Sequence, residues 1–305
     1  MANITRWLDT ECKVLQDAIN TIKGISEREC ESDVTRYCNW KIEKEFNEAK
    51  KIELNNNNIE YSYCSISFDT IRPGEEPVED RTTHNKCFVI VYFSGSNVNY
   101  IIDRNSDAKT ILRKLLNYSG KNEIKENNFN INSDLFIWLI SKVYYNENIL
   151  ESSVKDESNI VLRSIKGFKG DSEDYLTKVT ASGESVIKII SSLSFILESR
   201  NINQIKIEID YGQNKGIEVE LNVKSFIKLD ISNYIGEYLL ENEEETLVKL
   251  YLLFYLEIFP KIIQLYQNEK EAELWNKEGN IKFLEDVAKA LTESIELKLD
   301  ILKKD

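Results

Sequence analysis

The stretch LVKLYLLFYLEIF, residues 247–259, contains only two polar side chains, Lys249 and Glu257. A helix with this sequence is apolar around nearly its whole circumference, which is typical of a helix buried in a protein interior. With Glu245 and Lys261, the two polar residues recur at multiples of four, so they predict one narrow solvated stripe along the helix. We therefore expect a buried central helix around which a C-terminal core is built.

The same stretch does not fit a membrane-spanning helix. A spanning helix needs about twenty consecutive apolar residues, whereas Lys249, Glu257 and Pro260 interrupt this run. Because charges at the centre of a bilayer are costly, we expect no membrane insertion. The prediction is a helix over residues 243–268 that continues past a kink at Pro260. An amphipathic helix is expected to follow over residues 281–299.

The composition is that of a soluble globular protein. The chain has 305 residues, of which 42% are hydrophobic and 30% are charged, so it can bury one large core or two ordinary ones. The first residues, MANITRWLDTECK, contain acids and no apolar run, which predicts a cytoplasmic protein without a signal peptide. Five cysteines without CxxC spacing and a single histidine argue against a zinc site. No glycine-rich phosphate loop is present in usable form, so we expect no cofactor.

Hydrophobic periodicity predicts an α+β fold with two domains, in which helices cover antiparallel sheets. The N-terminal domain, residues 1–150, is expected to open with a helical hairpin that ends at four asparagines. Its expected helices cover residues 5–23, 32–54, 108–116 and 134–145, and its expected strands cover 61–68, 87–93 and 99–103. Residues 71–86 between the first two strands are predicted to form an exposed loop.

The C-terminal domain, residues 160–305, is expected to combine an antiparallel sheet and a covering helix with the two C-terminal helices. The cleanest hairpin joins residues 204–211 to 216–223, because isoleucines alternate with charged residues there. The other expected elements are strands at 160–168, 175–181 and 226–231 and a helix at 184–199. The polar stretches 120–132 and 151–159 are the candidates for the domain boundary.

The charge is unevenly distributed along the chain. The net charge is −13, yet residues 81–170 contain 13 Lys and Arg against 9 Asp and Glu. A basic segment in an acidic protein permits a nucleic-acid or phosphate partner.

Two groups of residues are the candidates for such binding. Around a predicted turn, cations surround an aromatic ring and could hold a phosphate backbone and stack a base; these are Arg163, Lys166, Phe168, Lys169 and, across the turn, Lys178. The second group is Arg113 and Lys114, with Arg104 and Lys109 nearby. The alternative for both groups is a set of solvated cations without a partner.

One arrangement of acids resembles the core of a restriction-type nuclease, in which carboxylates on adjacent strands and a lysine bind a metal ion and orient water. Asp210 would be the first acid, followed by Glu218, Glu220 and Lys224. The match is imperfect, because Asn222 stands where the motif requires a carboxylate. Charged pairs on the solvated face of a sheet explain the same alternation, so both interpretations stay open.

The single histidine, His84, lies in the predicted loop within RTTHNK. It could act as a general base, but spacing alone assigns it neither a nucleophile nor an orienting acid. A solvated loop histidine is the alternative.

The absence of a recognisable catalytic motif predicts a cytosolic, non-catalytic binding or regulatory protein that acts as a subunit of a homo- or hetero-oligomeric complex. Fifteen tyrosines and apolar helices at both ends of the chain favour large interfaces with a protein partner or a second copy. The abundance of Asn, Ile and Lys is typical of AT-rich bacteria and their mobile elements, which associates the protein with phage-defence systems. The alternatives are a nucleic-acid-binding component that uses residues 81–170 and a metal-dependent nuclease centred on Asp210 and Glu220.

Overall fold

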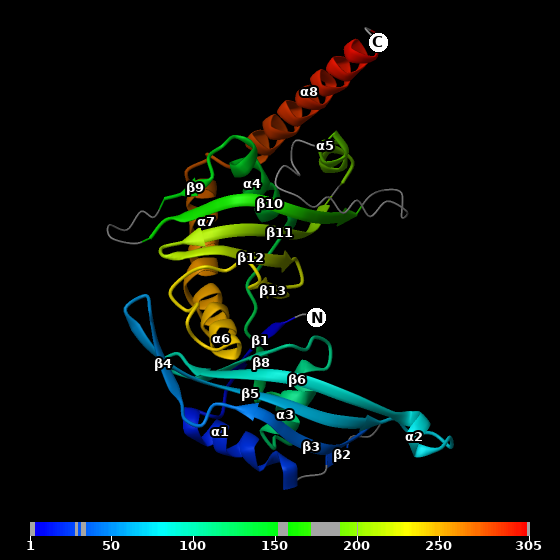
Figure 1. Cartoon of the computed structure of the whole chain (residues 1–305), viewed down its shortest axis with the longest axis vertical. Coiled ribbons are helices and arrows are strands. Elements are labelled where there is room, and N and C mark those ends of the chain that lie inside the picture. Colours follow the sequence, from blue (N-terminus) through cyan, green and yellow to red (C-terminus); the bar gives the residue numbers. More distant parts are fainter. Residues whose placement is uncertain are drawn as a thin grey trace. The chain divides into compact units, whose positions relative to one another are not determined.

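A computed structural model of the chain describes residues 4–27, 30–31, 35–151, 158–171, 190–199 and 201–303. The chain separates into two compact units, unit 1 (Met1–Phe129) and unit 2 (Asn130–Asp305) (Figure 1). Each unit contains an antiparallel sheet and helices, so the predicted α+β class is confirmed.

Unit 1 is built on an eight-stranded sheet with the order β2-β3-β5-β6-β7-β1-β8, in which β4 pairs with β5 off this path. The strands are β1 (Thr5–Asp9), β2 (Cys30–Glu31), β3 (Arg36–Glu45), β4 (Lys50–Leu54), β5 (Asn57–Ile71), β6 (Thr82–Phe93), β7 (Val98–Ile102) and β8 (Ile124–Glu126). The helices are α1 (Leu15–Lys23), the 3₁₀ turn η1 (Gly24–Glu27), the short α2 (Val78–Arg81) and α3 (Ala108–Leu115). One hydrophobic cluster of unit 1 lies on one face of the sheet, where α1 and α3 bury their apolar sides against β5, β6 and β7.

The predicted N-terminal helical hairpin is wrong. Only α1 is helical, because residues 5–9 pair with β7 and β8, and the carboxylate of Asp9 accepts the N–H groups of Glu11 and Cys12 at 2.9 Å in a turn before the helix. The second helix, predicted over residues 32–54, is also wrong, because this segment contains strands β3 and β4. Burial alternates along β4 with period two, and Asn55 and Asn56 adopt φ of 48° and 59°. Two left-handed residues form a tight hairpin turn, which joins β4 to β5.

Unit 2 contains a five-stranded sheet with the order β13-β12-β11-β10-β9. The strands are β9 (Ile149–Leu150), β10 (Ile160–Asp171), β11 (Asn201–Tyr211), β12 (Asn214–Asn222) and β13 (Ile227–Asp230). The predicted hairpin is observed as β11 and β12, whose isoleucines point into the core. The predicted strand 175–181 lies outside the described residues, and α5 (Ile190–Glu198) corresponds to the second half of the predicted helix 184–199.

The remaining helices of unit 2 are α4 (Ser133–Tyr144), α6 (Glu243–Leu253), the π-helical turn η3 (Phe254–Ile258), α7 (Phe259–Glu271) and α8 (Lys277–Leu302). They include the two long C-terminal helices that the sequence predicts. Among the described residues, the structure contains no helix of the length and apolarity that crossing a membrane requires. Helix α4 packs on β10 and β11 within unit 2, whereas the sequence analysis grouped it with the N-terminal domain.

The central helix passes Pro260 by changing its hydrogen-bond pattern. The N–H of Phe259 bonds to the carbonyl of Phe254, five residues earlier, so the turn before the proline is π-helical. The wider turn accommodates the missing N–H and the ring of Pro260. Phe254, Ile258 and Phe259 are fully buried there, so the deviation stays inside the core.

The prediction of a solvated stripe along this helix is wrong, because Glu245 and Lys261 are buried. Lys249 pairs with Glu241 at 2.6 Å and with Glu245 at 3.3 Å. The ammonium group of Lys261 donates to the Ser158 carbonyl at 2.5 Å. Each charge therefore has a partner inside the fold, which makes its burial tolerable.

We expect Asp103 in unit 1 to make stability depend on pH. Burial raises the pKa of Asp103 from 3.8 to about 6, although its Oδ1 accepts the Phe88 N–H at 2.6 Å. The folded state therefore binds this proton more tightly than the unfolded state, and ionised Asp103 destabilises the fold above pH 6. Asp103→Asn keeps the acceptor and should raise the free energy of unfolding at pH 7.5 by on the order of 2 kcal/mol.

That gain should shrink as the pH falls through about 6 and vanish near the unfolded-state pKa of 3.8. Urea unfolding of both proteins between pH 4 and 8 measures it. Asp103→Ala is the control for the retained acceptor, because it leaves the Phe88 N–H without that partner, and it should show a smaller gain at every pH. A gain that does not change with pH would contradict the assignment.

Candidate functional site

One face of the five-stranded sheet in unit 2 is charged, and it contains several of the residues that the sequence nominated. Along β10 to β13, apolar side chains alternate with polar ones, so the apolar face packs into the core and the polar face remains. Bases and acids are interspersed on this polar face, so the nominated cations have carboxylates close by.

The nominated cations of β10 are paired with neighbouring side chains. The guanidinium group of Arg163 contacts the Asp210 carboxylate at 2.6 Å through Nε and at 2.5 Å through Nη2. Lys166 pairs with Glu208 at 2.7 Å. The Nζ of Lys169 donates to the side-chain carbonyl of Gln204 at 3.4 Å. A phosphate group would have to compete with carboxylates that already neutralise two of these three cations.

The expectation that Phe168 stacks a nucleic-acid base is wrong, because its ring is buried. Its side chain is only 3% exposed, and its ring lies 5.4 Å from that of Phe195 in α5. Register shifts on either side of it let Phe168 pair with Ile205 on the apolar face. The ring therefore belongs to the core, while Lys169 is exposed.

The other nominated cations do not extend this group within unit 2. Arg113 and Lys114 lie on α3 in unit 1, where Arg113 Nε is 4.0 Å from a Glu123 carboxylate oxygen. Lys114 Nζ lies 4.7 Å from the centre of the Tyr37 ring. Lys178 lies outside the described residues.

The nominated acids do not converge on one point. Glu220 is opposite Lys206 in the register of β11 and β12, four residues along β11 from Asp210. At about 3.3 Å per residue, that separation is roughly 13 Å, which is too far for the two carboxylates to share one metal ion. Glu218 pairs with Lys206 at 2.5 Å, and Lys224 follows the end of β12. Among the residues that the structure describes, no three His, Cys, Asp or Glu side chains are grouped to hold a metal ion.

The structure supplies an acid for His84 that sequence spacing did not reveal. His84 lies in β6 and not in a loop, which corrects the prediction, and it pairs with Asp69 of β5. Their side chains approach to 2.6 Å, and Asn39 donates to the same carboxylate at 2.7 Å. The hydrogen bond from Asn39 makes the larger contribution and the contact with His84 the smaller one, and both lower the pKa of Asp69. The imidazole is 86% exposed and has no hydrogen-bonded serine or cysteine among the described residues, so the pair lacks the nucleophile of a triad.

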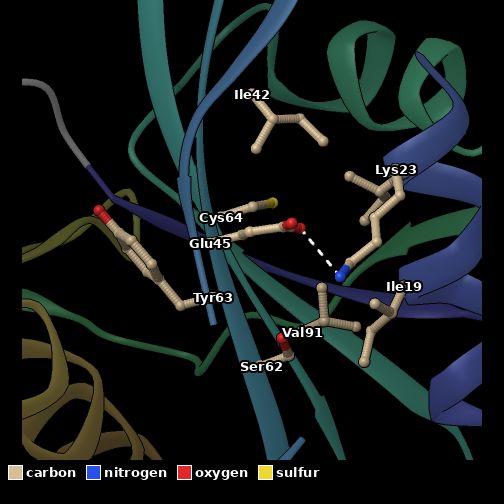
Figure 2. Close-up of a pocket in the computed structure, with 9 residues that line it drawn as sticks. Ile19, Lys23, Ile42, Glu45, Ser62, Tyr63, Cys64 and Val91 are labelled. Atoms are coloured by element: carbon tan, nitrogen blue, oxygen red, sulfur yellow. Dashed lines mark ion pairs between the residues drawn. The ribbon is translucent and has the colours of Figure 1, made fainter. Parts of the chain in front are cut away.

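A small apolar pocket lies between α1 and the sheet of unit 1 (Figure 2). Lys23 and Glu45 line the pocket and pair at 3.1 Å, and Cys64 also lines it. Burial raises the pKa of the Cys64 thiol to about 12, so the thiol stays protonated at neutral pH. A protonated thiol is a poor nucleophile, so this pocket gives no support for a nucleophilic role of Cys64.

Helix α8 is firmly attached to unit 2 through its first half. Phe283 and Val287 are fully buried. The ring of Phe283 packs edge-on against Tyr144 at 5.5 Å, and the hydroxyl of Tyr145 donates to the Asp286 carboxylate at 2.6 Å. These contacts hold the helix at the end of α4.

The second half of α8 extends beyond the sheet of unit 2 (Figure 1). Its exposed large apolar side chains are Ile295, Leu297, Leu299, Ile301 and Leu302, which are 43%, 66%, 48%, 55% and 65% exposed. Ile295, Leu299 and Leu302 lie on one side of the helix, because steps of three and four residues return to the same face, and we call these three the α8 apolar surface. The sequence predicts the amphipathic helix and the positions of Ile295 and Leu299. It does not reveal how exposed these side chains are, because that depends on where the body of unit 2 ends.

Removing Asp210 should affect stability and not a metal-dependent reaction. Asp210 accepts charge-assisted bonds from Arg163 and the N–H of Gly216 at 3.0 Å, so Asp210→Ala should lower the free energy of unfolding by about 2 kcal/mol. Glu220→Ala is the matched control and should change it by less than about 0.5 kcal/mol. Urea unfolding measures both, and magnesium-dependent nucleic-acid cleavage that both substitutions abolish would contradict this interpretation.

No known protein family matches this sequence, and no curated protein matches it either. Function is therefore inferred from the contacts, burial and charges of the chain itself.

Proposed function

We propose that this chain is a non-catalytic binding protein that acts as a subunit of a protein assembly, with the α8 apolar surface as its contact. The observation that carries the proposal is the cluster of Ile295, Leu299 and Leu302, which are 43%, 48% and 65% exposed on one side of α8. Single exposed leucines are ordinary. Several exposed apolar side chains on one side of a helix that extends beyond its sheet are characteristic of an interaction site.

The chemistry of α8 favours a protein partner over a membrane. Helices that lie on membranes usually carry Lys and Arg on their polar face, which attract anionic lipids. The polar face of this half of α8 contains Glu293, Glu296 and Asp300. Those acids would be repelled by an anionic bilayer, whereas they can border a protein interface.

The charged sheet face of unit 2 supports the nucleic-acid alternative less well. Arg163 and Lys166 are within 2.7 Å of carboxylates, and Phe168 is buried. A nucleic-acid surface needs cations that are available to phosphates. The cytoplasmic and phage-defence setting suggested by composition remains a prediction.

The second half of α8 is less stable when its apolar side chains are exposed to water than when they are covered, which supports the proposal of a partner. A helix of a few turns is only marginally stable in water without packing against its apolar side. Burying Ile295, Leu299 and Leu302 would contribute several kcal/mol, at about 1.5–3 kcal/mol for a fully buried side chain. A partner that covers this surface would therefore stabilise the helix and itself be bound.

Photo-crosslinking in cells tests the contact. A crosslinking amino acid at Leu302 should yield adducts of higher mass. The same residue at Glu293 is the control, because about 100° of rotation per residue places it roughly 180° around the helix from Leu302. Adducts of equal yield from both positions, or none from either, would remove the basis of the proposal.

A further inference from the structure

We infer that a cavity in unit 2 binds a small organic cation, in which an ammonium group is carried on a short apolar chain. The cavity lies where the edge strand β9 meets α4 and α7 (Figure 1), and we call it the β9 cavity. Its volume is about 300 Å³, and its lining combines Leu and Ile side chains with three glutamates and one lysine. This inference goes beyond the proposed function and does not depend on the α8 apolar surface.

The size and the apolar walls of the β9 cavity are those of a binding site. Pockets that hold small ligands begin at about 300 Å³. Leu150 of β9 and Leu265 of α7 line the cavity, and so does Ile149, which is 55% exposed. A ligand with an apolar chain would cover these side chains and gain the free energy of removing them from water.

The end of α4 fixes Glu147 beside Lys142. Asn146 adopts φ of 59°, its N–H donates to the Val143 carbonyl at 3.2 Å, and the N–H of Glu147 donates to the Lys142 carbonyl at 2.8 Å. These two bonds form a Schellman motif, which ends the helix and turns the chain back over its last turn. The Glu147 carboxylate therefore lies 3.0 Å from the Lys142 ammonium group.

Lys142 is not available to an anionic ligand, because its charge is already neutralised. Its Nζ lies 2.8 Å from Glu269 in addition to the contact with Glu147. The other carboxylate oxygen of Glu269 accepts the Nε1–H of Trp138 at 2.8 Å. Lys142 and Glu269 are thus used within the fold, and an anion would have to displace a carboxylate from Lys142.

The charge that remains in the β9 cavity is negative. Three carboxylates and one ammonium group line it, so two negative charges are in excess. The side chain of Glu147 is 61% exposed. Glu151 is exposed and has no ion-pair partner among the described residues. A bound ammonium group would balance this excess, while its apolar chain contacts Leu150 and Leu265.

Three probes of nearly equal size, hexylamine, hexan-1-ol and hexanoate, test the class of ligand. In methyl NMR spectra of the full chain at pH 7.5, hexylamine should shift the Leu150 and Leu265 signals in a saturable manner. Hexan-1-ol should bind about five-fold more weakly because it lacks the charge, and hexanoate should not bind. A response to hexanoate as strong as that to hexylamine, or hexylamine shifts that miss both leucines, would overturn the inference.

Glu147→Gln and Glu151→Gln test the carboxylates while keeping side-chain size. Each should weaken hexylamine binding about two- to five-fold, and the double variant about ten-fold, which is the range for a partly exposed charge pair. Glu271→Gln, at an exposed acid of α7 outside the lining, is the matched control and should bind like the parent. Because the replaced glutamates are exposed, circular dichroism should show the parent fold.

Equal hexylamine affinity in the parent and the double variant would also overturn the inference. That result would leave the Leu302 adducts unchanged, so the failure of this site is distinguishable from the failure of the proposed function.

Discussion

The architecture of unit 2 depends on the burial of a helix that has no polar face. Residues 247–259 present apolar side chains in nearly every direction, so the helix is stable only when it is covered. The sheet provides part of that cover, and the N–H of Leu229 in β13 donates to the hydroxyl of Tyr251 at 3.1 Å. Tyr211 of β11 donates to Glu257 at 2.6 Å, which satisfies a carboxylate that the helix brings inward. The helix and sheet therefore require each other.

In unit 1, as in unit 2, a buried carboxylate is satisfied by hydrogen-bond donors from other parts of the fold. Asp9 is fully buried at the end of β1. Its carboxylate accepts the hydroxyls of Tyr100 and Tyr118, each at 2.8 Å, in addition to two backbone N–H groups. Four donors around one carboxylate offset its loss of hydration. The contact also ties β1 to β7 and to the segment after α3, which are distant in sequence.

Satisfied polar groups and an uncovered apolar surface together point to the same kind of function. The cations and acids that the sequence nominates for chemistry are largely used within the fold, as the Arg163–Asp210 and Lys206–Glu218 pairs illustrate. The exposed His84 has an orienting acid but no neighbouring nucleophile among the described residues. The second half of α8, in contrast, has exposed apolar side chains. These observations support the proposal that the chain functions in protein association.

Features that depend on neighbours along the chain can be predicted from the sequence alone. The buried central helix, the hairpin of β11 and β12 and the amphipathic α8 follow from periods of 3.6 and 2 in the positions of apolar residues. Tertiary structure decided the rest. Residues 36–54 form strands because β5 pairs with them, and Phe168 faces the core because register shifts turn it there. The charges of the central helix are buried because partners such as Ser158 reach them from elsewhere in the chain. Pairing partners, strand register and the limit of a covering layer are set by residues far apart in sequence, so local pattern does not encode them.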